Sequence, residues 1–137
     1  MKYLILFLIG LFLISCNKSP DYETFINKQL TAHCDSLSQY TKVVIVPRQG
    51  CHSCVENADA YFFEYKDNKD CLFIFTHLVS EKLLRIELGY ENLVLSNVKI
   101  DKSNDFYSLD YADSQYPIVL NKNSEGHFTY SFLDTVK

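Results

Sequence analysis

The pattern of apolar and polar positions along this chain predicts helices that alternate with short strands. Apolar residues spaced by three and four positions between Tyr22 and Leu37 mark one face of a helix. The runs KVVIVP and CLFIFTHL are instead short, continuous and rich in β-branched or aromatic residues, as is typical of buried strands. The predicted elements are, in chain order, a helix over 21–37, a strand over 42–47, a helix over 55–65, a strand over 71–78, a helix from Ser80 to Gly89, and strands over 97–101, 116–120 and 127–133.

This alternation favours a parallel sheet with helices on both faces. The last two strands are joined by NKNSEG, a short turn that contains glycine, which indicates a terminal antiparallel hairpin. The chain has 137 residues, of which 47% are hydrophobic, enough for one domain with a buried core. We therefore expect a single α/β domain over residues 21–137, with a central mixed sheet and a polar, aromatic-rich loop around 102–115.

The first fifteen residues have the character of a targeting segment. One lysine is followed by an apolar run from Tyr3 to Ile14, shorter than the about 20 residues that span a bilayer. The end of this segment, LISC, resembles a bacterial lipobox, in which the cysteine is lipidated and becomes the mature N-terminus. The resemblance implies a signal peptide over 1–15, a lipidated Cys16 and a tether over 16–20. The alternatives are an ordinary signal peptide or an uncleaved anchor with an incidental cysteine.

Such a segment predicts a location in the cell envelope. The domain would be held to a bacterial membrane by its lipid and would face the periplasm or the cell surface. Disulfides form and persist in these compartments. The formal net charge is −4 and no cluster of Lys and Arg is present, so nucleic acid is not an expected partner.

Two cysteines stand in the sequence GCHSC, after the first predicted strand and before a predicted helix. Cys51 is therefore expected at a helix N-terminus, where unpaired N–H groups and the positive end of the helix dipole favour the thiolate. Cys54 lies three residues further on, about one turn away, where a second thiol can resolve a mixed disulfide.

The other two cysteines of the predicted domain are Cys34, on the apolar face of the first helix, and Cys71, in the second strand. They are expected either as two buried thiols or as a structural disulfide. The even number of cysteines and the predicted oxidising compartment favour the disulfide, which requires Cα atoms within about 7 Å.

VVIVPRQGCHSC with its following helix, and YPIVLNKNSEGHFTYSFL further on, resemble two motifs of the thioredoxin superfamily. The resemblance covers about residues 42–133, and the extra strand before the proline makes it closest to membrane-anchored extracytoplasmic thiol–disulfide proteins. It implies that Cys51 is the nucleophile and Cys54 the resolving cysteine. It also implies that Pro117 is a cis-proline beside the cysteine pair, in a substrate groove where the backbone of Tyr116 pairs with substrate.

Several positions depart from the family pattern. Gly50 replaces an aromatic residue that often precedes the first cysteine, and Ile45 replaces a buried aspartate of the thioredoxins proper. His52 and Ser53 separate the cysteines, and His52 is expected to add positive charge near the thiolate. The chain also ends soon after the predicted hairpin, so the helix that usually follows is not expected. These departures leave the direction of exchange open.

The sequence thus predicts a thiol–disulfide oxidoreductase whose redox centre is the Cys51–Cys54 disulfide, with no other cofactor and no metal. Its expected partners are protein thiols or disulfides, a redox partner protein, and the membrane through the lipid anchor. The alternative is a non-catalytic copper carrier or adaptor of the same fold. Copper carriers of this superfamily use two cysteines, usually spaced three apart, and a distant histidine, for which His77 and His127 are the candidates.

Overall fold

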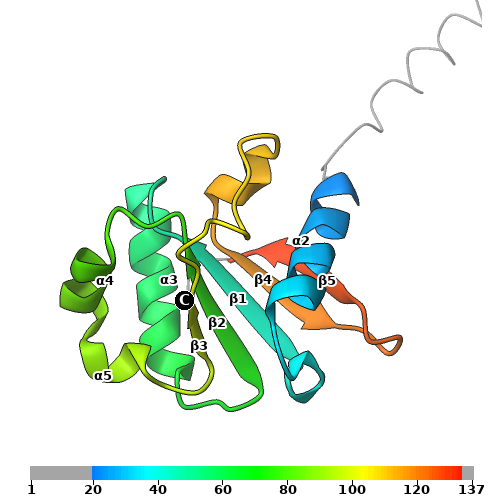
Figure 1. The fold of residues 1–137 in the computed structure, drawn as a ribbon, viewed down its shortest axis with the longest axis horizontal. Helices are drawn as coiled ribbons and strands as arrows, with labels where there is room; N and C mark the ends of the chain where they lie inside the picture. Colours follow the sequence, from blue (N-terminus) through cyan, green and yellow to red (C-terminus); the bar gives the residue numbers. More distant parts are fainter. Residues whose placement is uncertain (1–19, 134–137) are drawn as a thin grey trace, which may run out of the picture.

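The computed structural model describes residues 20–133, which fold into three layers (Figure 1). The predicted signal peptide, Cys16 and the tether up to residue 19 lie outside the described residues. The helices are α2 (Pro20–His33), α3 (His52–Tyr65), α4 (Glu81–Leu88), α5 (Tyr90–Leu93) and the 3₁₀ helices η2 (Leu37–Gln39) and η3 (Ala112–Gln115). The strands are β1 (Lys42–Pro47), β2 (Cys71–Thr76), β3 (Val98–Ile100), β4 (Ile118–Lys122) and β5 (Phe128–Phe132).

The five strands form one mixed sheet in the order β3-β2-β1-β4-β5. The central strand β1 pairs in parallel with β2 and antiparallel with β4, and β3 pairs in parallel with β2. The last two strands form an antiparallel hairpin in which Leu120 opposes Tyr130. The predicted α/β class, mixed sheet and terminal hairpin are therefore confirmed.

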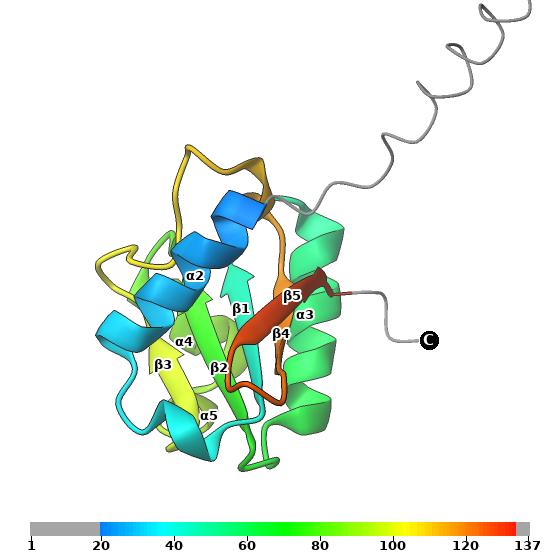
Figure 2. The ribbon, with the colours of Figure 1, turned by 90° about the vertical axis from the view of Figure 1, so that its right-hand side faces the viewer.

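Helices cover both faces of the sheet, as predicted: α2 lies on one face and α3, α4 and α5 lie on the other (Figure 2). Side chains along a strand point alternately to opposite faces. In β1, Val43 and Ile45 accordingly join the core under α2, and Val44 and Val46 join the core under α3. Because β1 is buried on both faces, its sequence is a continuous apolar run rather than an alternating one.

The connection from β3 back to β4 passes over the α2 face. It contributes the buried ring of Phe106 to the core under α2. The buried carboxylate of Asp101 starts this connection: it accepts hydrogen bonds from the hydroxyl of Thr76 at 2.7 Å and from the amides of Asp105 and Phe106 at 3.1 and 2.9 Å. The predicted loop around 102–115 is thus a fixed cover of the core that contains one short helix, η3.

The ends of several elements differ from the sequence-based expectation. The first helix ends at His33, because Ser36 turns the chain with a φ of 56°, although Leu37 still packs against the same core. The predicted helix from Ser80 is confirmed, since the Ser80 hydroxyl caps it by accepting from the amide of Leu83 at 3.0 Å. None of the helices in residues 20–133 has the length and apolar character needed to cross a bilayer.

The outer edge of β5 is covered by side chains of α2. The side-chain Nδ2 of Asn27 donates to the backbone carbonyl of Phe128 at 2.8 Å, and the side-chain Oδ1 accepts from the backbone amide of Phe128 at 3.1 Å. Glu23 accepts from the amide of Tyr130 at 3.3 Å. These contacts satisfy backbone groups that an open sheet edge would offer to another chain.

Cys34 and Cys71 are free thiols, so the structural disulfide between them is not formed. The physical reason is their placement: Cys34 packs against the core under α2, whereas Cys71 is buried in the core under α3, on the other side of the sheet. Burial raises the pKa of the Cys71 thiol to about 11 and also raises that of Cys34. Both are therefore weak nucleophiles near neutral pH.

Candidate functional site

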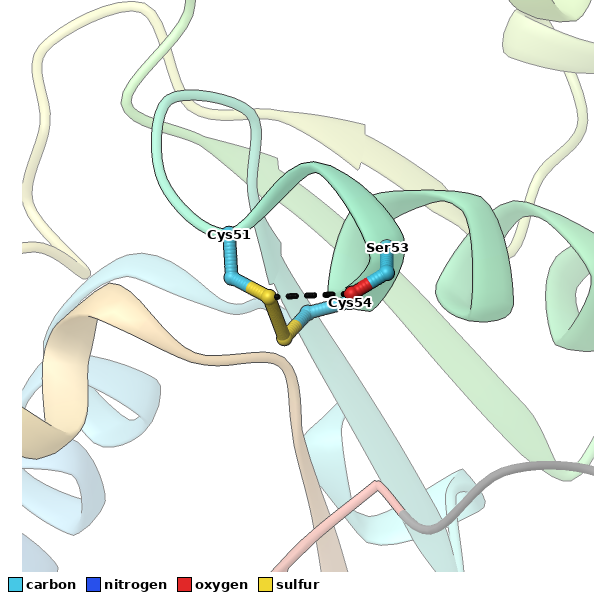
Figure 3. Close-up of a disulfide and its surroundings, with 3 residues drawn as sticks. All are labelled: Cys51, Ser53 and Cys54. Carbon is cyan, nitrogen blue, oxygen red and sulfur yellow. Dashed lines mark hydrogen bonds between the residues drawn. A yellow bond between two sulfur atoms is a disulfide. The ribbon is translucent and has the colours of Figure 1, made fainter.

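The sequence GCHSC forms the loop between β1 and α3 together with the first turn of that helix. Cys51 is the N-cap residue of α3 and is joined to Cys54 by a disulfide, with the two Cα atoms 5.2 Å apart (Figure 3). The carbonyl of Cys51 accepts from the amide of Val55 at 3.0 Å, which starts the helix. Both sulfur atoms therefore lie at the positive end of the α3 dipole, where a negative sulfur is stabilised once the disulfide is reduced.

The hydroxyl of Ser53 lies 3.3 Å from the Cys51 sulfur (Figure 3). A disulfide sulfur carries no proton, so in this form the hydroxyl is the donor. The same hydroxyl can donate to a Cys51 thiolate after reduction. A hydrogen bond to the charged form of a group favours that form, so Ser53 adds to the stabilisation that the helix N-terminus provides.

His52 lies at the surface, with 90% of its side chain exposed. Its Nε2 lies 3.1 Å from an Oε1 of Glu56, which is itself 67% exposed. The carboxylate offsets any positive charge that His52 carries, and water screens the pair. The expected contribution of His52 to the thiolate is therefore small.

The segment that leads into β4 packs against the loop that carries Cys51. A Cβ atom added at Gly50 would lie 2.9 Å from the backbone oxygen of Gln115, closer than real Cβ contacts. This approach explains why glycine stands where an aromatic residue was the family expectation. It also brings η3, which ends at Gln115, against the cysteine loop.

Pro117 is buried at the start of β4, but the cis bond that the resemblance implies is absent. Residues 20–133 contain no cis peptide bond, so the Tyr116–Pro117 bond is trans and that prediction is wrong. Tyr116 follows η3 in an extended conformation, with φ −114° and ψ 146°, which suits a residue before a trans proline. Its amide already donates to the Asp113 carbonyl at 3.2 Å, so pairing with a substrate strand through this amide requires η3 to open.

Sequence reasoning missed Arg48, which directly follows β1. Its side chain is only 5% exposed, and its guanidinium contacts both carboxylate oxygens of Asp59 on α3 and, at 2.6 Å, an Oε2 of Glu87 on α4. The amide of Arg48 also donates to the Thr76 carbonyl at 3.0 Å. Arg48 thus links the cysteine loop to β2, α3 and α4. The sequence shows only a charged residue after a buried strand, because both partners are distant in the chain.

The two candidate histidine ligands lie at opposite ends of the strands. His77 follows β2, and because Thr76 pairs with Pro47, His77 lies at the same end of the strands as the cysteine loop. Its ring stacks on Tyr107, with the two ring centroids 3.7 Å apart. His127 lies in the β4–β5 turn at the other end, where its Nε2 is 3.5 Å from a carboxylate oxygen of Glu23. Within the described part of the chain, no three His, Cys, Asp or Glu side chains are grouped as a metal site requires.

Comparisons with protein-family models, with characterised proteins and with solved structures find no match to this chain.

Proposed function

We propose that this chain is a thioredoxin-like thiol–disulfide exchange protein, held at a membrane surface by a lipid on Cys16. The observation that carries the proposal is the disulfide between Cys51 and Cys54 at the N-terminus of α3, directly after the central strand. This position supplies what a reactive cysteine pair needs: helix N–H groups, a positive dipole end, and a second thiol one turn away.

The reaction is a pair of sulfur exchanges. In the reduced protein, the Cys51 thiolate attacks one sulfur of a substrate disulfide, so that a Cys51–substrate bond forms and the other substrate sulfur leaves as a thiolate and takes up a proton. Cys54 then loses its proton and attacks the Cys51 sulfur, which releases the second substrate thiol and forms the Cys51–Cys54 disulfide. Two electrons have then passed to the substrate. A redox partner protein with two thiols reduces the Cys51–Cys54 disulfide again by the same two exchanges in reverse.

The assignment of Cys51 as the attacking residue has a local basis. Cys51 is the N-cap residue, and the Ser53 hydroxyl lies 3.3 Å from its sulfur. Cys54 lies in the first turn of α3, where it can reach the Cys51 sulfur but receives no hydrogen bond from Ser53 within the described residues.

The sheet supports the thioredoxin-like part of the proposal. A central strand leads into the cysteine pair and the helix, a parallel strand lies on one side of it, and an antiparallel hairpin lies on the other. The trans bond before Pro117 is a departure from that family, so a substrate strand would meet a differently shaped loop beside the disulfide. The predicted lipobox ending at Cys16 supports the anchor and the location in the cell envelope.

Trapping of the mixed disulfide tests this function. Cys54→Ser in the reduced protein is expected to form a stable mixed disulfide with a small disulfide substrate, seen as a mass increase, whereas Cys51→Ser forms none at the remaining Cys54. Ser53→Ala is expected to slow the alkylation of reduced Cys51 at neutral pH, because its thiolate loses a hydrogen-bond donor.

The opposite trapping result, with adduct only in Cys51→Ser, would show that the assignment of the attacking cysteine is wrong. No adduct in either variant, together with tight Cu(I) binding by the reduced protein that is lost in His77→Ala, would favour the copper carrier instead.

A further inference from the structure

A groove opens between α3 and α4, next to the loop that carries Cys51, although neither Cys51 nor Cys54 is among its lining residues. Its volume is about 420 Å³, and its lining includes both chain neighbours of Cys51, namely Gly50 and His52. From there the groove extends between Val55 on α3 and Leu83 on α4. A chain whose own cysteine is bonded to Cys51 would therefore meet this groove within its next few residues.

An exposed apolar stripe continues from the groove along α4 and into α5. Val79, Leu83, Ile86 and Tyr90 are 64%, 37%, 70% and 60% exposed. Within α4, Leu83 and Ile86 are three residues apart and therefore neighbours on one side of the helix. Val79 precedes the N-cap Ser80 and lines the same groove as Leu83, and Tyr90 begins α5 beyond Gly89. The opposite side of α4 is already used, because Leu84 and Leu88 are buried against the sheet. Single exposed apolar residues need no explanation, but Val79 and Leu83 line the same groove, and exposed apolar side chains beside a candidate site are typical of an interaction surface.

The groove is also acidic. Glu56, Asp59 and Glu87 line it, and among the described lining residues the only cations are Arg48 and, when protonated, His52. The Arg48 side chain is 5% exposed and pairs with both Asp59 and Glu87, so its one positive charge offsets only part of their two negative charges and the groove keeps a net negative charge. Glu56 remains 67% exposed at the end of the groove nearest the disulfide. An occupant with a lysine or arginine near this end would complement the charge.

We propose that this groove and stripe hold an extended polypeptide segment of the exchange partner, with a Lys or Arg and a large apolar side chain within a few residues of its cysteine. The inference rests on the proposed function, since the occupant is placed by its bond to Cys51. The cationic side chain lies near Glu56, and the apolar side chain packs between Val55 and Leu83. The partner class is therefore a protein with a basic and apolar flank around its disulfide.

The test compares two peptides on the reduced full-length chain. Each has a single cysteine carried as a mixed disulfide with 2-thiopyridine, a neutral leaving group whose release is followed by absorbance. In one peptide the cysteine is flanked on both sides by Leu and Lys, and in the other by Ser and Glu. The small neutral probe 2-hydroxyethyl 2-pyridyl disulfide measures the reactivity of Cys51 itself.

We expect the Leu/Lys peptide to react at least about fivefold faster than the Ser/Glu peptide at low salt, with the difference reduced as salt screens the charges. Leu83→Ser and Glu56→Gln should each bring the ratio below about twofold without changing the rate with the small probe. Phe63→Ser and Glu64→Gln, which alter an exposed ring and an exposed carboxylate further along α3, should leave the ratio unchanged.

Equal rates for the two peptides, or a preference for the Leu/Lys peptide that Leu83→Ser leaves unchanged, would overturn this inference. If the small probe still reacts normally at Cys51, the proposed function stands. Failure of the small probe to react at Cys51 would overturn both. A dimer that dissociates in Leu83→Ser, or binding to neutral lipid vesicles that is lost in this variant, would also overturn the inference, because a second copy or a membrane would then cover the stripe.

Discussion

Arg48 offers a sharp test of how the cysteine loop is held in place. Replacing Arg48 with Met keeps an apolar stem of similar length but removes the guanidinium that joins Asp59 and Glu87. Removing one partner of a fully buried ion pair lowers the free energy of unfolding by about 3–5 kcal/mol, whereas an exposed ion pair contributes about 0–1 kcal/mol. The Arg48 side chain is 5% exposed, but Asp59 and Glu87 are 23% and 41% exposed and can regain water. We therefore expect a loss of about 2–3 kcal/mol of folding free energy.

The matched control is Arg85→Met. Arg85 is also bound to a carboxylate, that of Glu81, but it is 49% exposed. It additionally lies 5.5 Å from the ring centre of Tyr90, so its removal should cost less than about 1 kcal/mol. The two variants differ in burial more than in chemistry.

The assay is urea unfolding of the oxidised full-length chain, followed by circular dichroism. With a slope of about 1.5 kcal/mol per molar urea, Arg48→Met should lower the midpoint by about 1.3–2 M, and Arg85→Met by less than about 0.7 M. Equal shifts for the two variants would refute the reasoning, since burial of the guanidinium would then have no energetic consequence.

Three further predictions concern the loop contact, the free thiols and the sheet edge. Gly50→Ala should destabilise the protein by about 1–3 kcal/mol in the same unfolding assay, because the new methyl group would collide with the backbone of Gln115. Cys71, whose pKa burial raises to about 11, should have only about 0.1% thiolate at pH 8 and resist iodoacetamide in the folded protein. Cys34 should also react slowly, and mass spectrometry should show both alkylated rapidly in urea. Asn27→Ala should cost about 1–2 kcal/mol and increase aggregation measured by light scattering, because the backbone of β5 loses two partners. Rapid alkylation of folded Cys71, or an Asn27→Ala variant as stable and soluble as the parent, would contradict these accounts.

Local sequence patterns were enough to predict the elements that carry the candidate site. The continuous apolar run of β1, the helical spacing after Cys54 and the serine that caps α4 each have a local physical cause. The short helix α5 was missed, because four residues after Gly89 are too few for a periodic pattern to show.

The errors concern relations between distant segments. Alternation along β2 places Cys71 on the same face of the sheet as Phe73 and Phe75. The sequence does not reveal that α2, with Cys34, packs on the opposite face, so it could not exclude the Cys34–Cys71 disulfide. The cis bond before Pro117 is implied only by a family motif, whereas the bond is trans and the backbone of Gln115 lies close to Gly50.

The measurement that tests the central claim most directly is the redox equilibrium of the Cys51–Cys54 pair in the folded full-length chain. The protein is equilibrated in a series of buffers with different ratios of reduced to oxidised glutathione, alkylated, and analysed by mass spectrometry. Peptide mapping follows the alkylation of Cys34 and Cys71 separately. The account predicts one reversible two-electron transition with a potential between about −270 and −120 mV, the range of known exchange proteins, and with the folded circular dichroism spectrum kept throughout. A pair that forms no disulfide in the most oxidising buffers, or one that is reduced only when the protein unfolds, would contradict it.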